Sequence, residues 1–260
     1  MKKLALVVGI NYEGTDNSLG GCINDTKEMC RLLVNKFGFK IEDIQLLIEE
    51  YAIKKNILDA LELLVTSLNP GDIGVFTYSG HGTQTADFPP LDELDMLDEA
   101  IVPFDGLASP SNLIRDDEIK EKLSKLKQDV HFTIIFDSCN SGDGTKFLEN
   151  EDKKKCLDAT PTITKIKELI NEVRPDRQRA IKSHALSGPN HILLAGCKSN
   201  QYSYDDGKNG YLTGALMEFM EKGMTYEELH TKVYAKVKKR SNDSQLPQLE
   251  GPMLSRKVLE

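Results

Sequence analysis

Short apolar runs, several of them rich in β-branched residues, alternate with helical patterns along most of this chain. The runs cover residues 3–10, 41–48, 73–78, 132–137 and 192–196. Continuous apolar runs of this length are typical of parallel strands, because helices cover a parallel sheet on both faces. The alternation of strands and helices therefore predicts an α/β protein with a parallel central sheet.

Six segments carry apolar residues at helical spacing. They cover residues 23–37, 53–68, 118–127, 163–173, 211–221 and 225–239. In the first of them, Asp25 and Glu28 are spaced as in a capping box, so a helix start near Asp25 is expected. Residues 80–117 show neither pattern, apart from a short apolar stretch at 100–103, which favours a functional loop there.

Length and charge narrow the functional classes. A chain of 260 residues can bury the core of one α/β domain. Its net charge of -8 opposes binding to nucleic acids and to anionic membranes, and no stretch is long and apolar enough to span a membrane. The five cysteines form no CxxC pair, which argues against a disulfide framework and a zinc site. We therefore expect a cytoplasmic protein with neither nucleic acid nor membrane as a partner.

Two polar motifs follow apolar runs directly. YSGHGTQ places His81 just beyond one run, and DSCNSG places Cys139 just beyond another. If the two strands are neighbours, about 4.8 Å apart, both side chains meet at the carboxyl edge of the sheet. An imidazole beside a thiol favours the nucleophilic thiolate, and the N–H groups of Gly82 and Cys139 could form an oxyanion hole. Each residue alone has a structural explanation, as a buried thiol or a satisfied histidine; together they indicate a Cys-His dyad.

The two motifs also resemble the catalytic blocks of the metacaspases, a family of caspase-fold cysteine peptidases. Further blocks resemble this family in the same order: GCINDT at 21–26, LDEAIVPFD at 97–105, RDDEI at 115–119 and LLAGCKSNQ at 193–201. One departure is Asn140, where the family usually has histidine. The QACRG signature of caspases is absent.

This resemblance implies a caspase-like three-layer α/β/α sandwich with a mostly parallel central sheet, acting as a cysteine endopeptidase. The expected organisation is one domain over residues 1–260. Within it, residues 1–142 form a catalytic part like the large caspase subunit, 143–187 a linker, and 188–260 a part like the small subunit. We expect a monomer.

The resemblance further implies cleavage after arginine or lysine in protein or peptide substrates. The family positions that line the pocket for the basic side chain match Cys22, Asp25, Ser79 and Asp137, and carboxylates suit a cationic ligand. Helix capping is the alternative role for Asp25, and a turn position is the alternative for Asp137.

Calcium dependence is also implied by the resemblance, with ligands that align with Asp98, Asp116 and Asp117, and with Asp143 as the nearest match to a fourth. Oxygen ligands suit this hard cation. The acidic stretch LDELDMLDEA lacks the spacing of an EF-hand, so a solvated loop is the alternative there. Capping of the following helix is the alternative for Asp116 and Asp117.

The linker is rich in basic residues, namely Lys153, Lys154, Lys155, Arg174, Arg177, Arg179 and Lys182. An enzyme that cleaves after such residues can cut itself there, so we hypothesise autoprocessing, with a solvated loop as the alternative. Two other functions remain open from the sequence. One is a caspase-fold peptidase of different specificity or without a metal requirement, and the other is a catalytically silent scaffold for protein binding, which Asn140 motivates.

Overall fold

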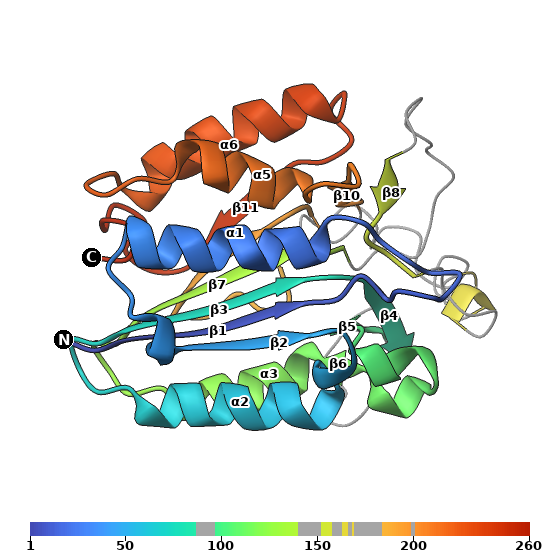
Figure 1. The fold of residues 1–260 in the computed structure, drawn as a ribbon, viewed down its shortest axis with the longest axis horizontal. Coiled ribbons are helices and arrows are strands. Elements are labelled where there is room, and N and C mark those ends of the chain that lie inside the picture. Colours follow the sequence, from blue (N-terminus) through green and yellow to red (C-terminus); the bar gives the residue numbers. More distant parts are fainter. Residues whose placement is uncertain (87–96, 140–151, 158–162, 166–167, 169–183, 199–200) are drawn as a thin grey trace.

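A six-stranded sheet forms the centre of the computed structural model, in the order β11-β9-β7-β3-β1-β2 (Figure 1). Its strands are β1 (Lys3–Gly9), β2 (Ile44–Ile48), β3 (Ile73–Ser79), β7 (His131–Asp137), β9 (Ile192–Ala195) and β11 (Gln248–Glu250). All pairs are parallel except β11 with β9. The structure describes residues 1–86, 97–139, 152–157, 163–165, 168, 184–198 and 201–260. The predicted mostly parallel sheet is confirmed.

Helices cover both faces of this sheet (Figure 1). One layer holds α1 (Cys22–Asn35), α5 (Tyr211–Phe219) and α6 (Tyr226–Arg240), and the other holds α2 (Lys54–Ser67) and α3 (Asp116–Leu123). The expected three-layer sandwich is therefore confirmed. Among the helices that the structure describes, none combines the length and the apolar character needed to cross a bilayer.

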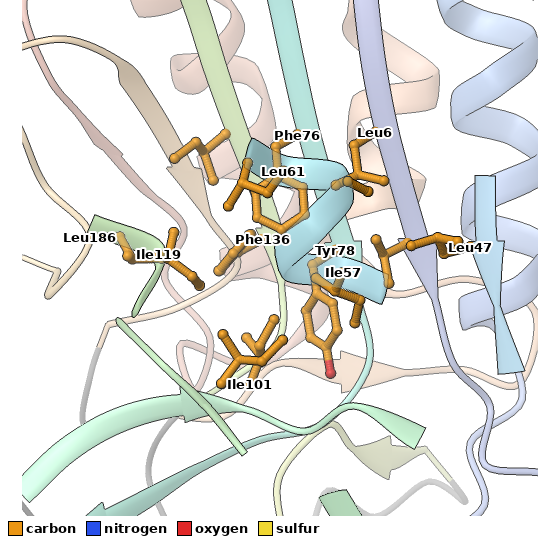
Figure 2. Close-up of a cluster of buried hydrophobic side chains, with 14 of the residues drawn as sticks. Leu6, Leu47, Ile57, Leu61, Phe76, Tyr78, Ile101, Ile119, Phe136 and Leu186 are labelled. Atoms are coloured by element: carbon orange, nitrogen blue, oxygen red, sulfur yellow. The ribbon is translucent and has the colours of Figure 1, made fainter. Parts of the chain in front are cut away.

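Each central strand contributes to two hydrophobic cores, because successive side chains of a strand point to opposite faces. Phe76 and Phe136, on the neighbouring strands β3 and β7, meet edge to face at 5.3 Å beneath α2 (Figure 2). Val75 and Ile135 point the other way and pack in the core that α1, α5 and α6 complete. Burial on both faces explains why these strands read as continuous apolar runs.

The register of the sheet brings the two polar motifs together. β3 pairs directly with β7, and the last pair of this ladder is Ser79 opposite Asp137. His81 and Cys139 each follow two residues after that pair. The condition stated from the sequence, that these two strands are neighbours, is therefore met.

The prediction of an irregular loop over residues 80–117 is partly wrong. A small antiparallel sheet lies there, built from β4 (Gly82–Ala86), β5 (Leu97–Ile101) and β6 (Ile114–Arg115). A two-stranded sheet pairs β8 (Lys153–Lys154) with β10 (Tyr204–Asp205). Strands of two to five residues contain too few side chains to show an alternating pattern. Many of these side chains are also polar, so the sequence did not indicate strands here.

Short 3-10 turns and the helix ends complete the described chain. The turns are η1 (Ile41–Asp43), η2 (Glu49–Tyr51), η3 (Phe104–Leu107) and η4 (Pro110–Asn112). η1 occupies the first residues of the run at 41–48, so β2 begins only at Ile44. The α3 helix begins at Asp116, two residues before the predicted start. Of the helix expected over 163–173, residues 163–165 and 168 are described, and they are helical.

Candidate active site

Residues 152–157 of the linker lie in an extended conformation across the carboxyl edge of the sheet. Strand β8 of this segment pairs antiparallel with β10, and the Lys155 N–H donates to the carbonyl oxygen of Ser203 at 2.9 Å. On the other side, the Leu157 N–H donates to the carbonyl oxygen of Gly82 at 3.0 Å. Backbone hydrogen bonds thus hold the chain on both sides of the Lys155 carbonyl, as when a peptide is bound by strand addition.

Three donors converge on that carbonyl oxygen. The N–H of Gly82 lies 3.1 Å from it and the N–H of Cys139 lies 3.3 Å from it. The Sγ atom of Cys139 lies 3.1 Å from the same oxygen. These two N–H groups are the pair that the sequence proposed as an oxyanion hole, and here they face a peptide carbonyl beside a thiol.

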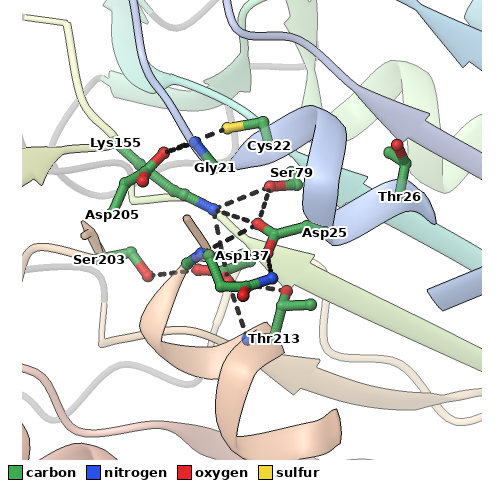
Figure 3. Close-up of polar contacts among 12 residues, drawn as sticks. Gly21, Cys22, Asp25, Thr26, Ser79, Asp137, Lys155, Ser203, Asp205 and Thr213 are labelled. Atoms are coloured by element: carbon green, nitrogen blue, oxygen red, sulfur yellow. Dashed lines mark hydrogen bonds and ion pairs between the residues drawn. The ribbon is translucent and has the colours of Figure 1, made fainter. Parts of the chain in front are cut away.

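The Lys155 side chain enters a buried acidic pocket (Figure 3). Its Nζ atom lies 3.0 Å from Asp25 Oδ2, 2.8 Å from Ser79 Oγ and 3.4 Å from Asp137 Oδ2. The side chain is 0% exposed. Burial alone lowers the pKa of Lys155, but the carboxylates of Asp137 and Asp25 reverse this effect and hold it well above its ordinary value. The ammonium group is therefore charged inside the protein.

Residues from the second half of the chain orient the two pocket carboxylates. Asp25 accepts hydrogen bonds from the Gly210 N–H at 3.1 Å and from Asn209 Nδ2 at 2.9 Å. Asp137 accepts from Ser203 Oγ at 2.9 Å and from the N–H of Thr213 at 2.9 Å. The sequence did not identify these partners, since none of them stands in a motif beside the residue that it contacts.

Cys22, the fourth predicted pocket residue, lies next to the acidic groups (Figure 3). It is fully buried, and its Sγ atom lies 3.8 Å from Asp205 Oδ2. Asp205 also accepts the N–H of Gly21 at 2.8 Å, which ties β10 to the start of α1. All four predicted pocket residues, Cys22, Asp25, Ser79 and Asp137, are therefore brought to one place.

The expected helix start near Asp25 is wrong. The α1 helix begins at Cys22, and Asn11 Oδ1 accepts the free N–H groups of Cys22 at 2.9 Å and of Ile23 at 3.3 Å. A side chain two residues beyond β1 thus caps this helix, a contact that a local pattern cannot reveal. The carboxylate of Asp25 therefore does not cap the helix and instead binds Lys155 in the pocket.

His81 is held as a neutral ring. Its Nε2 atom lies 2.7 Å from the carbonyl oxygen of Asn17, and its ring packs against Tyr12 with centroids 4.7 Å apart. A carbonyl only accepts hydrogen bonds, so this contact assigns the proton to Nε2 and leaves a lone pair on Nδ1. Nδ1 is buried and has no hydrogen-bond partner among the described residues. Burial lowers the pKa of His81 to about 4.

The resting thiol is neutral as well. Cys139 is 1% exposed, and burial raises the pKa of its thiol well above the ordinary value. The neutral thiol lies beside the Lys155 carbonyl, and the neutral imidazole belongs to the residue directly before Gly82, whose N–H donates to the same carbonyl. Asn140, the departure from the metacaspase pattern, lies outside the described residues.

The acidic residues expected to bind calcium gather around two basic side chains. Arg115 Nη1 lies 3.0 Å from Asp98 Oδ2 and 4.0 Å from Asp117 Oδ2. Lys120 Nζ lies 2.7 Å from Asp116 Oδ2 and 3.3 Å from Asp117 Oδ1. The structure thus brings these three aspartates together, although Asp143 lies outside the described residues.

The chemistry of this aspartate cluster fits a hard cation. Asp116 is 3% exposed, and its Oδ1 atom has no hydrogen-bond partner within the described part of the chain. Burial raises the pKa of Asp116, against the opposing effect of Lys120. Among the described residues, no three acidic, histidine or cysteine side chains are placed to hold a metal ion, and Arg115 and Lys120 contact oxygens of this cluster. A metal ion would have to displace Arg115 and Lys120.

Comparisons with known proteins identify relatives among the caspase-domain proteins. A family model described as the caspase domain matches residues 2–259. Metacaspase-1 of Schizosaccharomyces pombe is 36% identical over 250 residues, which cover 83% of this chain and 58% of that protein. Metacaspase-4 of Arabidopsis thaliana is 42% identical over 147 residues, covering 55% of this chain and 34% of that protein. The chain therefore spans less than two thirds of the length of these relatives.

A solved structure resembles nearly the whole chain. The crystal structure of a protein from Geobacter sulfurreducens superimposes with a TM-score of 0.71 at 26% identity, covering 98% of this chain and 97% of that one. The likeness extends over the central sheet and both helical layers.

The pKa of His81 can be measured by NMR in the Cys139→Ala protein, with His81→Gln identifying its signal. We expect a midpoint near 4, whereas the same chain unfolded in urea should titrate near 6.5. Because folding lowers this pKa, protonation favours the unfolded chain. The contribution of His81 to the free energy of unfolding therefore falls as the pH drops from about 6.5 towards 4. A folded midpoint of about 6 or higher would contradict the neutral, buried ring.

Proposed function

Because the chain belongs to the caspase-domain family of peptidases, we propose that it is a cysteine endopeptidase that cleaves polypeptides after lysine or arginine. The observation that carries this proposal is the binding of Lys155. Its ammonium group lies among Asp25, Ser79 and Asp137, while its carbonyl faces Cys139 and two backbone donors. A lysine held at both ends in this way occupies the place of a substrate residue.

The proposed chemistry uses the dyad of Cys139 and His81. Nδ1 of the neutral imidazole takes the thiol proton, and Sγ attacks the carbonyl carbon of the bound residue. The N–H groups of Gly82 and Cys139 stabilise the negative oxygen that forms. The imidazolium then protonates the leaving amine, and water hydrolyses the thioester to release the acid and restore the thiol. The Asn17 carbonyl accepts a hydrogen bond from Nε2–H, so the proton stays on that nitrogen and Nδ1 is left to act as the base.

The pocket explains the preference for a basic residue. A cation in this desolvated site replaces hydration by contacts with Asp25 and Asp137, which hydrogen bonds from other residues hold in place. The planar guanidinium of arginine can bind both carboxylates at once. An acidic side chain would bring a third negative charge into the pocket, so cleavage after aspartate is disfavoured.

The first substrate of this enzyme is its own linker. The bond between Lys155 and Cys156 carries the carbonyl that the three donors hold, and it lies within the predicted linker of residues 143–187. While this bond is intact, residues 152–157 fill the site and exclude other chains. Cleavage there lets the new ends leave, which opens the pocket to substrates in trans.

Calcium is the proposed activator, held by Asp98, Asp116 and Asp117. Bound calcium would supply the positive charge that Arg115 and Lys120 now provide to these carboxylates. Asp98 lies on β5, where it pairs with Thr85 of β4, and β4 begins at Gly82. Asp98 is thus on the strand next to the one that begins with an oxyanion donor, so we propose that calcium binding shifts β4 and with it the N–H group of Gly82.

Hydrolysis of short fluorogenic peptides tests the proposed activity. With calcium present, we expect hydrolysis after arginine and lysine but not after aspartate, because of the acidic pocket. Cys139→Ala should lower kcat/KM by about a thousandfold or more, since it removes the nucleophile. The matched control is Cys30→Ala, which alters a partly buried cysteine of α1 and should keep the activity. Equal hydrolysis after aspartate, or an active Cys139→Ala protein, would overturn the proposal.

Mass spectrometry of the protein incubated with calcium tests self-cleavage. Cleavage after Lys155 should yield fragments 1–155 and 156–260. Lys155→Gln should abolish this cut because the pocket loses its cation, and Cys139→Ala should abolish it because the nucleophile is gone. Lys165→Gln, an exposed linker residue, should leave it unchanged. The same fragments from the Cys139→Ala protein would show that another protease makes the cut.

Calorimetric titration with calcium tests the metal site apart from activity. In a Cys139→Ala background, Asp116→Asn should weaken calcium binding by about tenfold or more, because a hard cation depends on the charge of its oxygen ligands. Asp59→Asn, which changes an aspartate with 62% side-chain exposure on α2, is the control. Equal affinities of the two variants would contradict the assignment.

A further inference from the structure

The residue before the bound lysine contacts an aromatic ring. Lys154 Nζ lies 4.2 Å from the centroid of the Tyr202 ring. That ring is 9% exposed and is supported from the side by Tyr204, with centroids 6.5 Å apart. A cation over an aromatic face at this distance is attracted by the negative face of the ring, and more strongly where water is excluded.

The backbone determines where this side chain lies. Lys154 is paired with Tyr204 in the β8–β10 ladder, and the next residue, Lys155, donates its N–H to Ser203. These contacts use main-chain atoms only, so any substrate chain bound in the same way repeats them. The side chain at the position before the scissile residue therefore falls on Tyr202, whatever the sequence of the substrate.

We propose that Tyr202 is a specificity-determining residue that selects a second basic residue, directly before the lysine or arginine at which the chain is cut. The preferred substrates are then polypeptides with tandem basic residues. This inference rests on the proposed function, because it describes a neighbouring position of the same site.

The next position toward the N-terminus provides a contrast. Lys153 is exposed, and its Nζ atom donates to the carbonyl oxygen of Ser18 at 2.6 Å and to Ser18 Oγ at 3.3 Å. A solvated ammonium group gains little from such contacts, because it exchanges hydrogen bonds with water for similar ones. Selectivity should therefore be strict for the scissile residue, moderate at the Tyr202 position and weak at the Ser18 position.

Packing of the lysine stem against the Tyr202 ring is the competing explanation. A substrate with norleucine at this position distinguishes stem packing from a cation–π contact, because norleucine keeps an unbranched aliphatic chain without the charge. A ring that only buries a stem would favour norleucine over lysine, whereas a cation–π contact favours lysine and arginine.

The test compares peptides that all end in arginine before the reporter group and differ at the preceding residue. For the parent enzyme, kcat/KM should be about three- to thirtyfold higher with lysine than with norleucine there. Tyr202→Phe should retain this ratio, since it keeps the ring, and Tyr202→Leu should bring it close to one. Ser18→Ala is the control and should leave the ratio unchanged. Norleucine one position further from the cut should have little effect.

The self-cleavage reaction gives an independent measurement. Lys154→Arg should cut itself after Lys155 at nearly the parent rate, and Lys154→Met, an uncharged and unbranched replacement, more slowly. If Tyr202→Leu does not fold, the inference is tested by the lysine-to-norleucine ratio of the parent enzyme and by the self-cleavage rates of the Lys154 variants. Efficient hydrolysis with equal rates for lysine and norleucine would overturn this inference alone. Absence of hydrolysis after arginine in every peptide would overturn the proposed function and this inference with it.

Discussion

The site depends on one buried charge, the ammonium group of Lys155 between Asp25 and Asp137. A cation without solvent is costly unless carboxylates and further hydrogen bonds surround it, and removal of one partner leaves an uncompensated charge. The two aspartates come from α1 and β7, and the lysine comes from the linker. This ion cluster therefore joins three distant parts of the chain. It also positions the Lys155 carbonyl, because the same residue is held at its backbone.

In the proposed function, the protein contains its own enzyme–substrate contact. The reacting groups belong to one chain, so their encounter has no translational cost, and the carbonyl lies beside both the thiol and the oxyanion donors. Burial meanwhile keeps both side chains neutral, since it lowers the pKa of His81 and raises that of the Cys139 thiol. In the proposed function, a longer substrate binds as this linker segment does, through backbone pairing with β10 on one side and with Gly82 on the other.

Much of the site could be read from the sequence, because its residues stand at the ends of strands. An apolar run that ends in a polar motif predicts a functional group at the carboxyl edge of a parallel sheet, and both His81 and Cys139 obey this rule. The pocket residues came from resemblance to metacaspases. The helix cap was assigned wrongly, because Asn11, which follows β1, caps α1 and takes the role that local spacing gave to Asp25.

The sequence by itself determined the α/β class, the order of strands and helices, and the two motifs, since these follow from patterns within a few neighbouring residues. Only the tertiary structure decided which of the linker lysines enters the pocket, and that Asn17 orients His81 and Tyr202 receives Lys154. Lys153, Lys154 and Lys155 are identical side chains in succession. Alternation along an extended chain turns Lys154 away from the side of its two neighbours. The pairing with β10 and the hydrogen bond from the Lys155 N–H to Ser203 then place Lys155, rather than Lys153, at the acidic pocket.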